Sequence, residues 1–384
     1  MTSVVVMAGG KGTRIRPLTF SRPKPLVPVA NRPMLDYIIQ RVIDSGYSKI
    51  IMTLGYLKGQ ISSYVSSRYP DLDFRFSSEK KPLGTAGGVR AAASDIDDTF
   101  IVISGDVLFD LDLQQMVRFH RKKDAIVTMA LTPVDDPSHY GIAVLDDDRR
   151  ITRFHEKPRP EEVFSKIANA GIYVMEPEIF DYVPEGNSDF SSDIFPALIN
   201  ENKELYGFVF TGYWNDAGKP DTFLKANHDA LNGQITPTPE GELLNEVPGR
   251  FGDIWVGQDV LIGEGVRIAG PVVIGDGTMI EDGAFIGRGT VIGSGVYVGS
   301  DSFVRGSVIL DGSRIEKGSQ LVNCIVDEFC DIRENCIVER CAMIGRGALL
   351  EPSTIIRSHC SVSNNLRILS GSLLDSDYPL VAEQ

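Results

Sequence analysis

Three glycines and two cations close to residue 10 form the stretch whose residue types could do chemistry. Gly9, Gly10 and Gly12 let the backbone turn tightly and direct its N–H groups toward an anion. Arg14 follows directly and Lys24 follows ten residues later, so fixed positive charge accompanies the loop. Backbone donors together with cationic side chains predict a binding site for a polyphosphate.

Spacing distinguishes this loop from two better-known glycine loops. No stretch of the chain has the Gly-x-x-x-x-Gly-Lys-Ser/Thr pattern of a Walker loop. A dinucleotide-binding fingerprint would need a glycine where Ile15 stands. A plain solvated turn would explain the glycines, but it would not explain Lys11, Arg14 and Lys24 beside them.

A carboxylate stands at the end of an apolar segment further along the chain. The run 100–104 reads as a buried strand, and Asp106 follows it, so we expect this side chain at the carboxyl edge of a sheet. Beside a triphosphate, Asp106 would be a Mg²⁺ ligand, because Mg²⁺ prefers one or two carboxylates plus phosphate oxygens. A role as a simple cap after the strand stays open at this point, and Asp110 and Asp112 read as turn and cap residues.

The elements that position these residues follow an alternating pattern. Val4–Val6 reads as a buried parallel strand, and apolar residues at helical spacing over 35–43 predict a helix with one buried face. Further strands are expected at 49–54, 74–76, 100–104, 125–131, 169–174 and 205–210, a hairpin at 140–144 and 151–154, and helices at 86–94, 113–121, 177–182, 192–200 and 221–231. This pattern predicts an α/β fold with a Rossmann-like open mixed sheet and flanking helices.

The segment 8–25 resembles the signature of the sugar-1-phosphate nucleotidyltransferases, the nucleotide-sugar pyrophosphorylases. Two later segments match further signatures of that family: Glu156-Lys157-Pro158, and the Trp-x-Asp-x-Gly-x-Pro pattern over 214–220. Ala217 stands where isoleucine or valine is commoner in the family, which we interpret as a packing change. The resemblance covers most of the first 230 residues and implies that the glycine loop wraps a nucleoside triphosphate.

The resemblance also implies a role for individual residues. The catalytic set would be Arg14, Lys24, Asp106 and Lys157. The nucleotide would be bound by Ala8, Gly9, Gly10, Gly12, Thr13, Glu79, Gly84 and Thr85, although 83–88 could equally be a small-residue packing turn. The sugar phosphate would be bound by Gly141, Glu156, Lys157, Asn169 and Gly171, and Asp106 and Asp216 would hold Mg²⁺.

The second half of the chain repeats with a period of six residues. Aliphatic residues recur in step from Val256 to Leu310 and again from Val326 to Val362. The step from Leu310 to Val326 is sixteen positions, which we interpret as a phase slip of four residues. Since neither an α-helix nor a plain strand has this period, it predicts a parallel β-helix with three edges per coil, resembling the left-handed hexapeptide β-helix. Cys330, Cys336 and Cys360 fall at the small position of the repeat and are expected to be core thiols.

Length and charge limit the remaining possibilities. The 384 residues allow two domains, which we place at 1–231 for the nucleotidyltransferase domain and 251–370 for the β-helix, with a linker at 232–250 and a tail at 371–384. A net charge of −14 argues against a nucleic-acid partner, and five cysteines without a Cys-x-x-Cys pair give neither a disulfide framework nor a zinc motif. No signal peptide and no apolar run near the ~20 residues of a membrane span occur, so a soluble, cytoplasmic protein is expected.

These observations predict an enzyme that joins a nucleoside triphosphate to a sugar-1-phosphate with Mg²⁺ as cofactor. The layout is most similar to the mannose-1-phosphate guanylyltransferases, which would make GDP-mannose the product, and glucose-1-phosphate uridylyl- and thymidylyltransferases share nearly every motif. A non-catalytic regulatory subunit that binds nucleotide-sugar is an alternative, and so is a bifunctional enzyme in which His359 serves acetyl transfer. The flat sides of the β-helix predict a homo-oligomer.

Overall fold

The computed structural model describes residues 2–79, 81–244 and 250–378. Within these ranges no helix combines the length and the apolar character needed to cross a bilayer. The chain divides into two compact units, each of which is described by itself. The first contains Met1–Lys11, Pro23–Leu26 and Met34–Trp214, and the second contains Gly12–Arg22, Val27–Pro33 and Asn215–Gln384.

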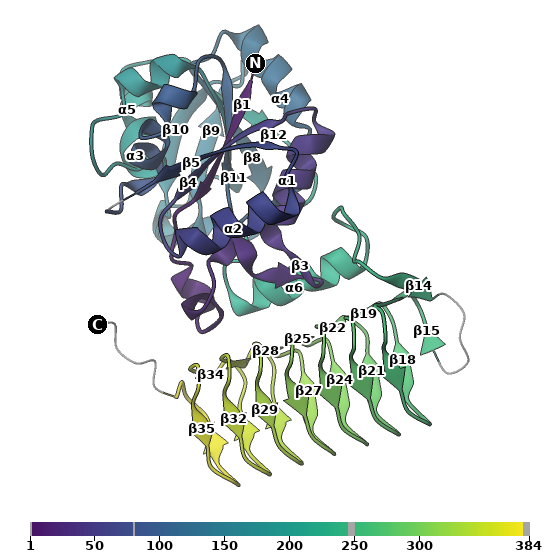
Figure 1. Cartoon of the computed structure of the whole chain (residues 1–384). Helices are drawn as coiled ribbons and strands as arrows, with labels where there is room; N and C mark the ends of the chain where they lie inside the picture. The colour runs from purple at the N-terminus through teal and green to yellow at the C-terminus, as the bar shows by residue number, and fades with distance from the viewer. Residues whose placement is uncertain (1, 80, 245–249, 379–384) are drawn as a thin grey trace. The chain divides into compact units, whose positions relative to one another are not determined.

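An open mixed sheet forms the centre of the first unit (Figure 1). Four neighbouring strands are parallel, in the order β6 (Phe100–Ser104), β1 (Ser3–Ala8), β4 (Lys49–Leu54) and β5 (Asp73–Ser78). The sheet continues beyond β6 through β11 (Ile167–Met175), β9 (Gly141–Leu145) and β10 (Ile151–Glu156), with β8 (Val127–Pro133) and β12 (Leu205–Val209) branching from β11. Because β11 is antiparallel to β6, the sheet is mixed, as predicted.

Helices cover both faces of this sheet. Alternate residues of the central strands point to opposite sides, so that Val4 and Val6 of β1 enter one core and Val5 enters the other. The first core is closed by α1 (Met34–Asp44), α2 (Lys58–Arg68) and α4 (Leu113–Lys123), and the second by α3 (Gly84–Arg90) and α5 (Phe195–Asn200). This two-layered cover confirms the predicted Rossmann-like arrangement.

Some local predictions differ from the structure. The helix α2 was not identified from the sequence, because Ile61 and Val65 are its only buried residues and give a weak periodic signal. The helix α1 covers Met34–Asp44, directly after the short strand β3 (Arg32–Pro33), and so extends the predicted 35–43 by one residue at each end. Only the later part of the predicted helix at 192–200 is α-helical: α5 covers Phe195–Asn200, and a π-helical turn at Phe190–Ile194 precedes it.

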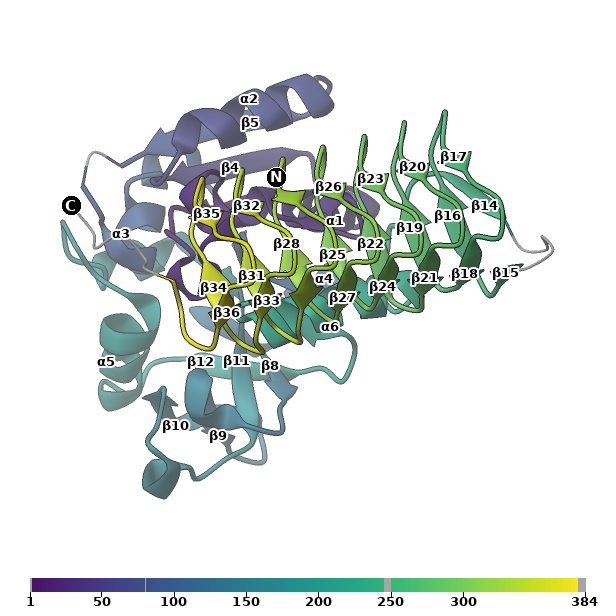
Figure 2. The same ribbon diagram turned by 90° about the horizontal axis from the view of Figure 1, so that it is seen from below.

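The second unit contains a parallel β-helix built from three sheets, which Figure 2 shows as stacked rows of short strands. The first sheet contains β16 (Ile254–Val256), β19 (Val272–Ile274), β22 (Thr290–Ile292), β25 (Val308–Ile309), β28 (Ile325–Val326), β31 (Met343–Ile344) and β34 (Ser361–Val362). The second contains β15 (Arg250–Phe251), β18 (Arg267–Ala269), β21 (Phe285–Gly287), β24 (Phe303–Arg305), β27 (Gln320–Val322), β30 (Ile337–Val338), β33 (Ile355–Ile356) and β36 (Leu373–Leu374). The third contains β17 (Leu261–Ile262), β20 (Met279–Ile280), β23 (Tyr297–Val298), β26 (Arg314–Ile315), β29 (Asp331–Ile332), β32 (Leu349–Leu350) and β35 (Arg367–Ile368).

The aliphatic ladder inside the β-helix corrects the predicted phase of the repeat. Ile292 pairs with Ile309, and Ile309 pairs with Val326, so Ile309 lies in the ladder where Leu310 was expected. The spacing shortens to five residues twice, between Val304 and Ile309 and between Leu321 and Val326. The sequence therefore contains two one-residue deletions at corners of the coil, and the expected single slip of four residues is wrong.

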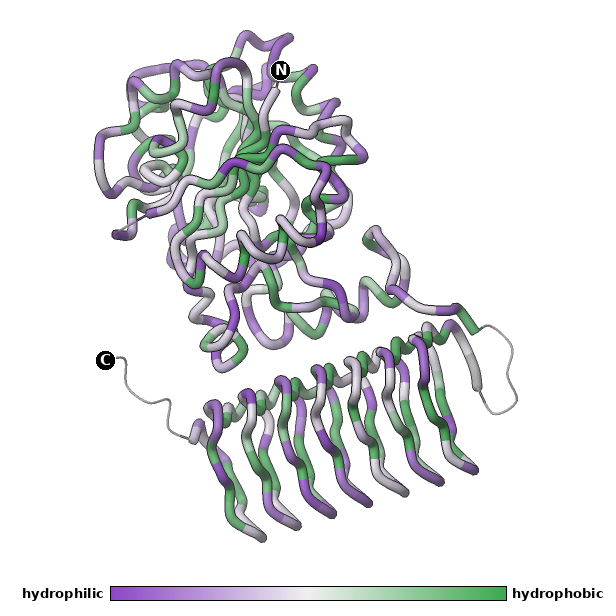
Figure 3. The backbone as a smooth tube through the Cα atoms, in the orientation of Figure 1, coloured by the Kyte–Doolittle hydropathy of each residue, from purple (hydrophilic) through white to green (hydrophobic). Residues whose placement is uncertain are grey.

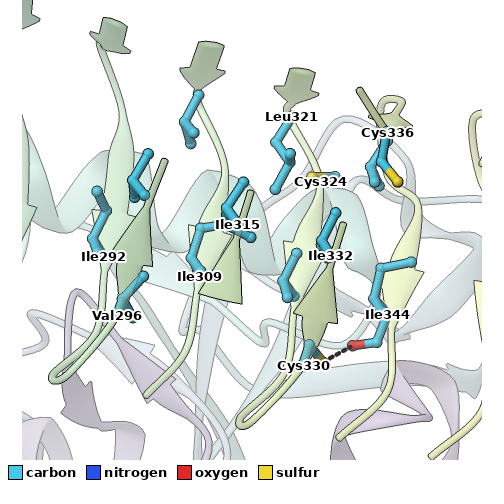
Figure 4. Close-up of a cluster of buried hydrophobic side chains, with 14 of the residues drawn as sticks. Ile292, Val296, Ile309, Ile315, Leu321, Cys324, Cys330, Ile332, Cys336 and Ile344 are labelled. Atoms are coloured by element: carbon cyan, nitrogen blue, oxygen red, sulfur yellow. Dashed lines mark hydrogen bonds between the residues drawn. The ribbon is translucent and has the colours of Figure 1, made fainter. Parts of the chain in front are cut away.

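The interior of the β-helix is filled by aliphatic side chains and thiols, as Figure 4 shows. Cys330, Cys336 and Cys360 are all buried, which confirms the prediction of core thiols. Burial raises the pKa of the Cys330 thiol to about 12. Polar and apolar residues alternate along each coil (Figure 3), as the inward and outward positions of a strand require.

The helix α6 (Pro220–Leu231) and the segment Val27–Pro33 pack against the β-helix within this unit. The Asn31 side chain donates to the Ile292 carbonyl at 2.7 Å, and the His228 ring lies 3.3 Å from the Gly306 carbonyl oxygen. A Cβ at Gly289 would stand 2.7 Å from the same ring, so this corner needs glycine to admit the helix. These segments belong with the second unit, whereas the sequence placed them in a domain of residues 1–231.

The ends of the β-helix also differ from the expected boundaries. The strand β14 (Glu242–Leu244) pairs with β16 inside the predicted linker, and β36 extends the ladder to Leu374, past the predicted end at 370. Residues 245–249 of the predicted linker and 379–384 of the predicted tail lie outside the described residues.

Candidate active site

A lysine and a carboxylate meet at the end of the central strand β6, in the first unit. The Lys24 ammonium donates to Asp106 Oδ2 at 2.8 Å, and the Ser104 hydroxyl donates to Asp106 Oδ1 at 2.6 Å. The Lys24 side chain is only 5% exposed, whereas that of Asp106 is 35% exposed. A lysine buried this deeply needs a charged partner, so the pair holds a cation and a partly open carboxylate in fixed positions.

The predicted nucleotide-binding residues of the first unit include a compact group around Glu79. A Cβ at Gly88 would stand 2.6 Å from Glu79 Oε1, and one at Gly9 would stand 3.6 Å from the same atom. The other carboxylate oxygen of Glu79 accepts from the Leu83 backbone N–H. Glu79 therefore lies between the glycine loop and the second glycine-rich segment, and glycine is needed at position 88 to make room for its carboxylate.

The second glycine-rich segment has a structural function of its own. Gly84 has a φ of +70°, and a Cβ there would stand 2.3 Å from the Ser188 carbonyl oxygen. The Thr85 hydroxyl donates to Asp189 Oδ1 at 2.7 Å and accepts from the Phe190 backbone N–H. Gly84 and Thr85 thus hold the start of α3 against residues 188–190, which agrees with the packing-turn alternative and leaves a nucleotide role for them as a prediction.

The predicted sugar-phosphate residues lie at the junction of β9 and β10. A Cβ at Gly141 would stand 2.7 Å from Glu156 Oε2, so glycine is needed beside this carboxylate. Lys157 follows Glu156 with a left-handed φ of 47°, and its ammonium lies 3.4 Å from Glu156 Oε1. Its side chain is 65% exposed, so the ammonium is free to turn toward an anion.

Asn169 and Gly171 shape the irregularity in the interior of β11, where the pairing with β8 shifts between Asn169 and Tyr173. The Asn169 side chain accepts from the Gly171 backbone N–H at 2.9 Å and donates to the Tyr173 hydroxyl at 2.9 Å. Gly171 has a φ of +73°, and a Cβ there would stand 3.2 Å from the Ser104 Cβ. Gly171 therefore lets β11 approach the residue that holds Asp106, which links the two predicted groups of site residues.

Two aromatic residues beside this irregularity were not proposed as site residues from the sequence. The Trp214 indole N–H, in β13 (Trp214–Asn215), donates to the Ala170 carbonyl at 2.9 Å. The Tyr140 ring packs against it edge to face, with the ring centroids 5.1 Å apart. Trp214 belongs to the signature over 214–220, and Tyr140 directly precedes Gly141, so their positions in the sequence could have identified both as candidates. The same is true of Ser104, two residues before Asp106.

In the second unit, Arg14 pairs with Asp216. The Arg14 guanidinium donates to Asp216 Oδ2 at 3.3 Å, and the Arg14 side chain is 51% exposed. A Cβ at Gly218 would stand 2.6 Å from Asp216 Oδ2 and 2.8 Å from Arg14 Nη2. Glycine is therefore required at position 218, because both charged groups lie directly over its Cα.

The loop that carries Arg14 is tightly folded. Gly12 has a φ of +61° and precedes a 3₁₀ turn at Thr13–Ile15, and a second 3₁₀ turn follows at Leu18–Phe20. The Thr19 hydroxyl donates to the Gly12 carbonyl at 2.8 Å. Thr13 and, in the first unit, Gly10 are exposed, while Ala8 is buried at the end of β1.

The carboxylates of Asp106 and Asp216 have the chemistry that a Mg²⁺ ion prefers in the presence of phosphate oxygens. Asp106 is partly open to solvent, and Asp216 is held by a guanidinium and by the Gly218 backbone N–H. Among residues 2–79, 81–244 and 250–378, no cluster of three or more His, Cys, Asp or Glu side chains could hold a metal by itself. Each carboxylate, taken by itself, could therefore contribute to an ion whose other ligands include phosphate oxygens and water.

The sequence of residues 3–233 matches the family model described as "Nucleotidyl transferase", and residues 252–356 match the "EIF2B subunit epsilon LbH domain". The chain is 35% identical over 248 residues to a UTP--glucose-1-phosphate uridylyltransferase from Synechocystis, an alignment that covers 60% of this chain and 64% of the relative. It is 36% identical over 239 residues to a mannose-1-phosphate guanylyltransferase from Mycobacterium tuberculosis, covering 61% and 66%. The match thus spans less than two thirds of each relative.

Solved structures resemble the same part of the chain. HddC from Yersinia pseudotuberculosis complexed with GMP-PN superposes with a TM-score of 0.53 at 30% identity, covering 60% of this chain and 99% of that one. A putative glucose-1-phosphate thymidylyltransferase from Bacillus anthracis superposes with a TM-score of 0.56 at 26% identity, covering 62% and 97%.

Proposed function

The chain belongs to the nucleotidyl transferase family, and from that premise we propose that it transfers a nucleotidyl group from a nucleoside triphosphate to a sugar-1-phosphate. The products would be a nucleotide-sugar and pyrophosphate. The observation that carries this proposal is the 2.8 Å contact between the buried Lys24 ammonium and Asp106 at the end of β6. A turn that served only packing would not bury a lysine beside an open carboxylate.

In this reaction an oxygen of the sugar phosphate attacks the α-phosphorus while the bond to the leaving pyrophosphate breaks. No general base is needed, because a phosphate monoester is already ionised at neutral pH. The main obstacle is repulsion between two anions, which Arg14, Lys24 and Lys157 would offset by holding phosphate oxygens. Lys157 would orient the attacking phosphate, and Arg14 with the N–H groups of the glycine loop would hold the pyrophosphate.

Asp106 and Asp216 are the residues that we propose to hold Mg²⁺, on the basis of the family signatures and their carboxylate chemistry. When bound, Mg²⁺ would neutralise charge on the phosphate oxygens. Ser104 and Lys24 fix the rotamer of Asp106, and Arg14 fixes that of Asp216. The sugar itself would lie near Glu156, Asn169 and Gly171, and the base near Glu79.

For the substrates we propose GTP and mannose-1-phosphate, with GDP-mannose as product. The support is the named activity of several relatives, among them the one from Mycobacterium tuberculosis. The relative from Synechocystis keeps uridylyl transfer to glucose-1-phosphate as the competing choice. The residues described above recognise phosphates and hydroxyl groups, and these are common to both substrate pairs.

A pyrophosphate-release assay tests the proposal directly. Four nucleoside triphosphates are crossed with mannose-, glucose- and glucosamine-1-phosphate, each with Mg²⁺ and each again with EDTA. We expect turnover with GTP and mannose-1-phosphate that EDTA abolishes. Turnover with another pair would change the substrate but keep the reaction, whereas inactivity with all twelve pairs, combined with binding of a nucleotide-sugar, would identify a regulatory subunit.

The β-helix is proposed to mediate self-association rather than acyl transfer. Its outer surface carries a stacked aromatic pair, Phe285 and Phe303, with ring centroids 4.9 Å apart. His359 is exposed and lies at a corner of the coil with a φ of 65°. Acetyl-CoA turnover that disappears in the His359→Ala variant would instead establish a second activity.

A further inference from the structure

A buried ion pair within the second unit joins the loop that carries Arg14 to the β-helix. The Arg22 guanidinium donates to Asp327 Oδ1 at 2.7 Å and lies 2.9 Å from Glu328 Oε1. The Arg22 side chain is 8% exposed and that of Asp327 is fully buried. These residues are 305 positions apart in the sequence. Arg22 lies within the 8–25 signature, but neither residue has been assigned a role in the proposed reaction.

The acidic side of this contact is itself held in place. Asp327 Oδ1 also accepts from the Glu328 backbone N–H, and Arg346 binds the second oxygen of Glu328 at 2.8 Å. Arg346 in turn lies over the Phe329 ring, 5.1 Å from its centroid. Arg22 therefore inserts into a preformed acidic corner between β28 and β29, rather than into a flexible surface patch.

The segment on the other side of the contact is short and stiff. Gly12–Arg22 consists of two consecutive 3₁₀ turns closed by the Thr19–Gly12 hydrogen bond, and its Ile15 and Leu18 side chains are buried. Arg14 and Arg22 therefore lie in one short segment that these turns and the buried side chains hold in a fixed conformation.

The energetics of the ion pair indicate position rather than stability as its function. Burying two charges costs several kcal/mol, so a buried pair often stabilises a fold no better than apolar residues of similar volume would. The second oxygen of Asp327 is buried and has no hydrogen-bond partner within the described ranges, which adds to that cost. The ion pair does hold the Arg22 guanidinium in one position and orientation.

We propose that Asp327 is a positioning residue, which acts through Arg22 to hold Arg14 where it can bind the phosphates of the nucleoside triphosphate. The β-helix is then a structural part of the nucleotide-binding loop as well as an assembly module. This inference depends on the function proposed above, because it assigns Arg14 to the triphosphate.

The test compares Asp327→Asn and Arg22→Gln with the double variant. We expect each single change to raise the KM for the nucleoside triphosphate by about 10-fold or more, as misplacement of a phosphate-binding group would. The KM for the sugar phosphate should stay within about 2-fold, since that substrate is assigned to Lys157. The double variant should resemble the single ones, because Asp327 acts only through Arg22.

Glu339→Gln is the matched control, since Glu339 is a β-helix carboxylate whose hydrogen bonds go to Arg357 and Ser358, outside the 12–22 segment. It should leave both KM values unchanged. Equal changes in both KM values, additive effects of the two single variants, or wild-type kinetics in Asp327→Asn would each overturn the proposal.

Hydrogen exchange provides a readout that does not need turnover. Amides in residues 13–22 should exchange faster in Asp327→Asn, while β-helix peptides distant from residue 327 keep wild-type protection. Unchanged exchange in 13–22 would also refute the inference. If the wild-type protein turns over none of the substrate pairs, the proposed function fails, and the exchange result still decides whether Asp327 holds the segment.

Discussion

At the scale of single residues, each proposed phosphate-binding cation lies close to a carboxylate. Lys24 contacts Asp106, Arg14 contacts Asp216, and the Lys157 ammonium lies near Glu156. Without substrate, each carboxylate fixes and partly neutralises the cation beside it. Lys24 is the most buried of the three, so its position depends most strongly on its partner.

We expect Lys24→Ala to lower kcat by at least ~100-fold, the scale of losing one preorganised donor in an active site. The loss should persist in Lys24→Met, which keeps the apolar stem of the side chain and so separates the missing charge from a packing defect. Steady-state kinetics measure both variants, with the exposed Lys58→Ala as control. Turnover within a few-fold of wild type in Lys24→Met would remove this residue from the mechanism.

Gly218→Ala should reduce kcat/KM by at least about 10-fold, because the added methyl group would displace Asp216 or Arg14 from its position. Gly59→Ala is the matched control, since a Cβ at Gly59 meets nothing within 4 Å. Steady-state kinetics measure kcat/KM for both variants. A wild-type kcat/KM in Gly218→Ala would mean that the contact between Arg14 and Asp216 has no part in the reaction.

At the scale of elements, the strands carry the candidate site residues and the turns that follow them orient the side chains. The strand β6 delivers Asp106, and the hairpin of β9 and β10 delivers Glu156 and Lys157. In the β-helix, the same alternation of a strand sends one residue of each pair into the core and the next to the surface. The stability of this element should therefore depend on which side of the strand a residue occupies.

Leu350→Ala should destabilise the β-helix by about 3 kcal/mol, since Leu350 is fully buried and the truncation leaves a cavity. Leu369→Ala makes the same chemical change at a side chain that is 63% exposed, and should cost no more than about 0.5 kcal/mol. Guanidinium unfolding followed by circular dichroism compares the two. Equal effects would contradict the assigned inward and outward positions.

At the scale of the whole molecule, the second unit is assembled from three separate parts of the sequence. Gly12–Arg22 and Val27–Pro33 join Asn215–Gln384, while residues of the first unit come between them in the chain. A change of protonation in the β-helix therefore occurs in the same unit as the segment that carries Arg14, the proposed phosphate-binding cation. Asp327 is the buried carboxylate through which such a titration would act.

Burial raises the pKa of Asp327 from 3.8 to about 6, and the nearby Arg22 guanidinium offsets only part of this shift. The folded protein therefore binds a proton between pH 4 and pH 6 that the unfolded chain has released, so its free energy of unfolding falls as pH rises through this window. The unfolding free energy of wild type minus that of Asp327→Asn should therefore decrease by about 3 kcal/mol in total as pH rises through this window.

Denaturant titrations of both proteins across this pH range measure the difference. Glu339→Gln is again the control, because Arg357 lowers the pKa of Glu339, so its contribution is present at higher pH and is lost as pH falls. A pH-independent difference between wild type and Asp327→Asn would mean that Asp327 does not titrate in this window.

The sequence by itself determined the fold class and most of the candidate chemistry. Apolar runs before Gly9 and Asp106, and the period of six in the second half, depend on local side-chain patterns that a reader can follow residue by residue. The helix α2 was not predicted, because its buried face is too small to give a helical repeat of apolar residues. The inward position of Ile309 was not predicted, because Leu310 beside it is equally apolar and only strand pairing distinguishes the two.

Tertiary structure alone decided which distant residues meet. Nothing in the sequence couples Arg22 to Asp327, or requires Gly218 because of Arg14, since these contacts join positions about 200 to 300 residues apart. The division of the chain into units was also hidden, because Gly12–Arg22 has no composition that marks it as part of the β-helix unit. Local patterns specify elements, whereas burial of charge and close backbone approach depend on packing between them.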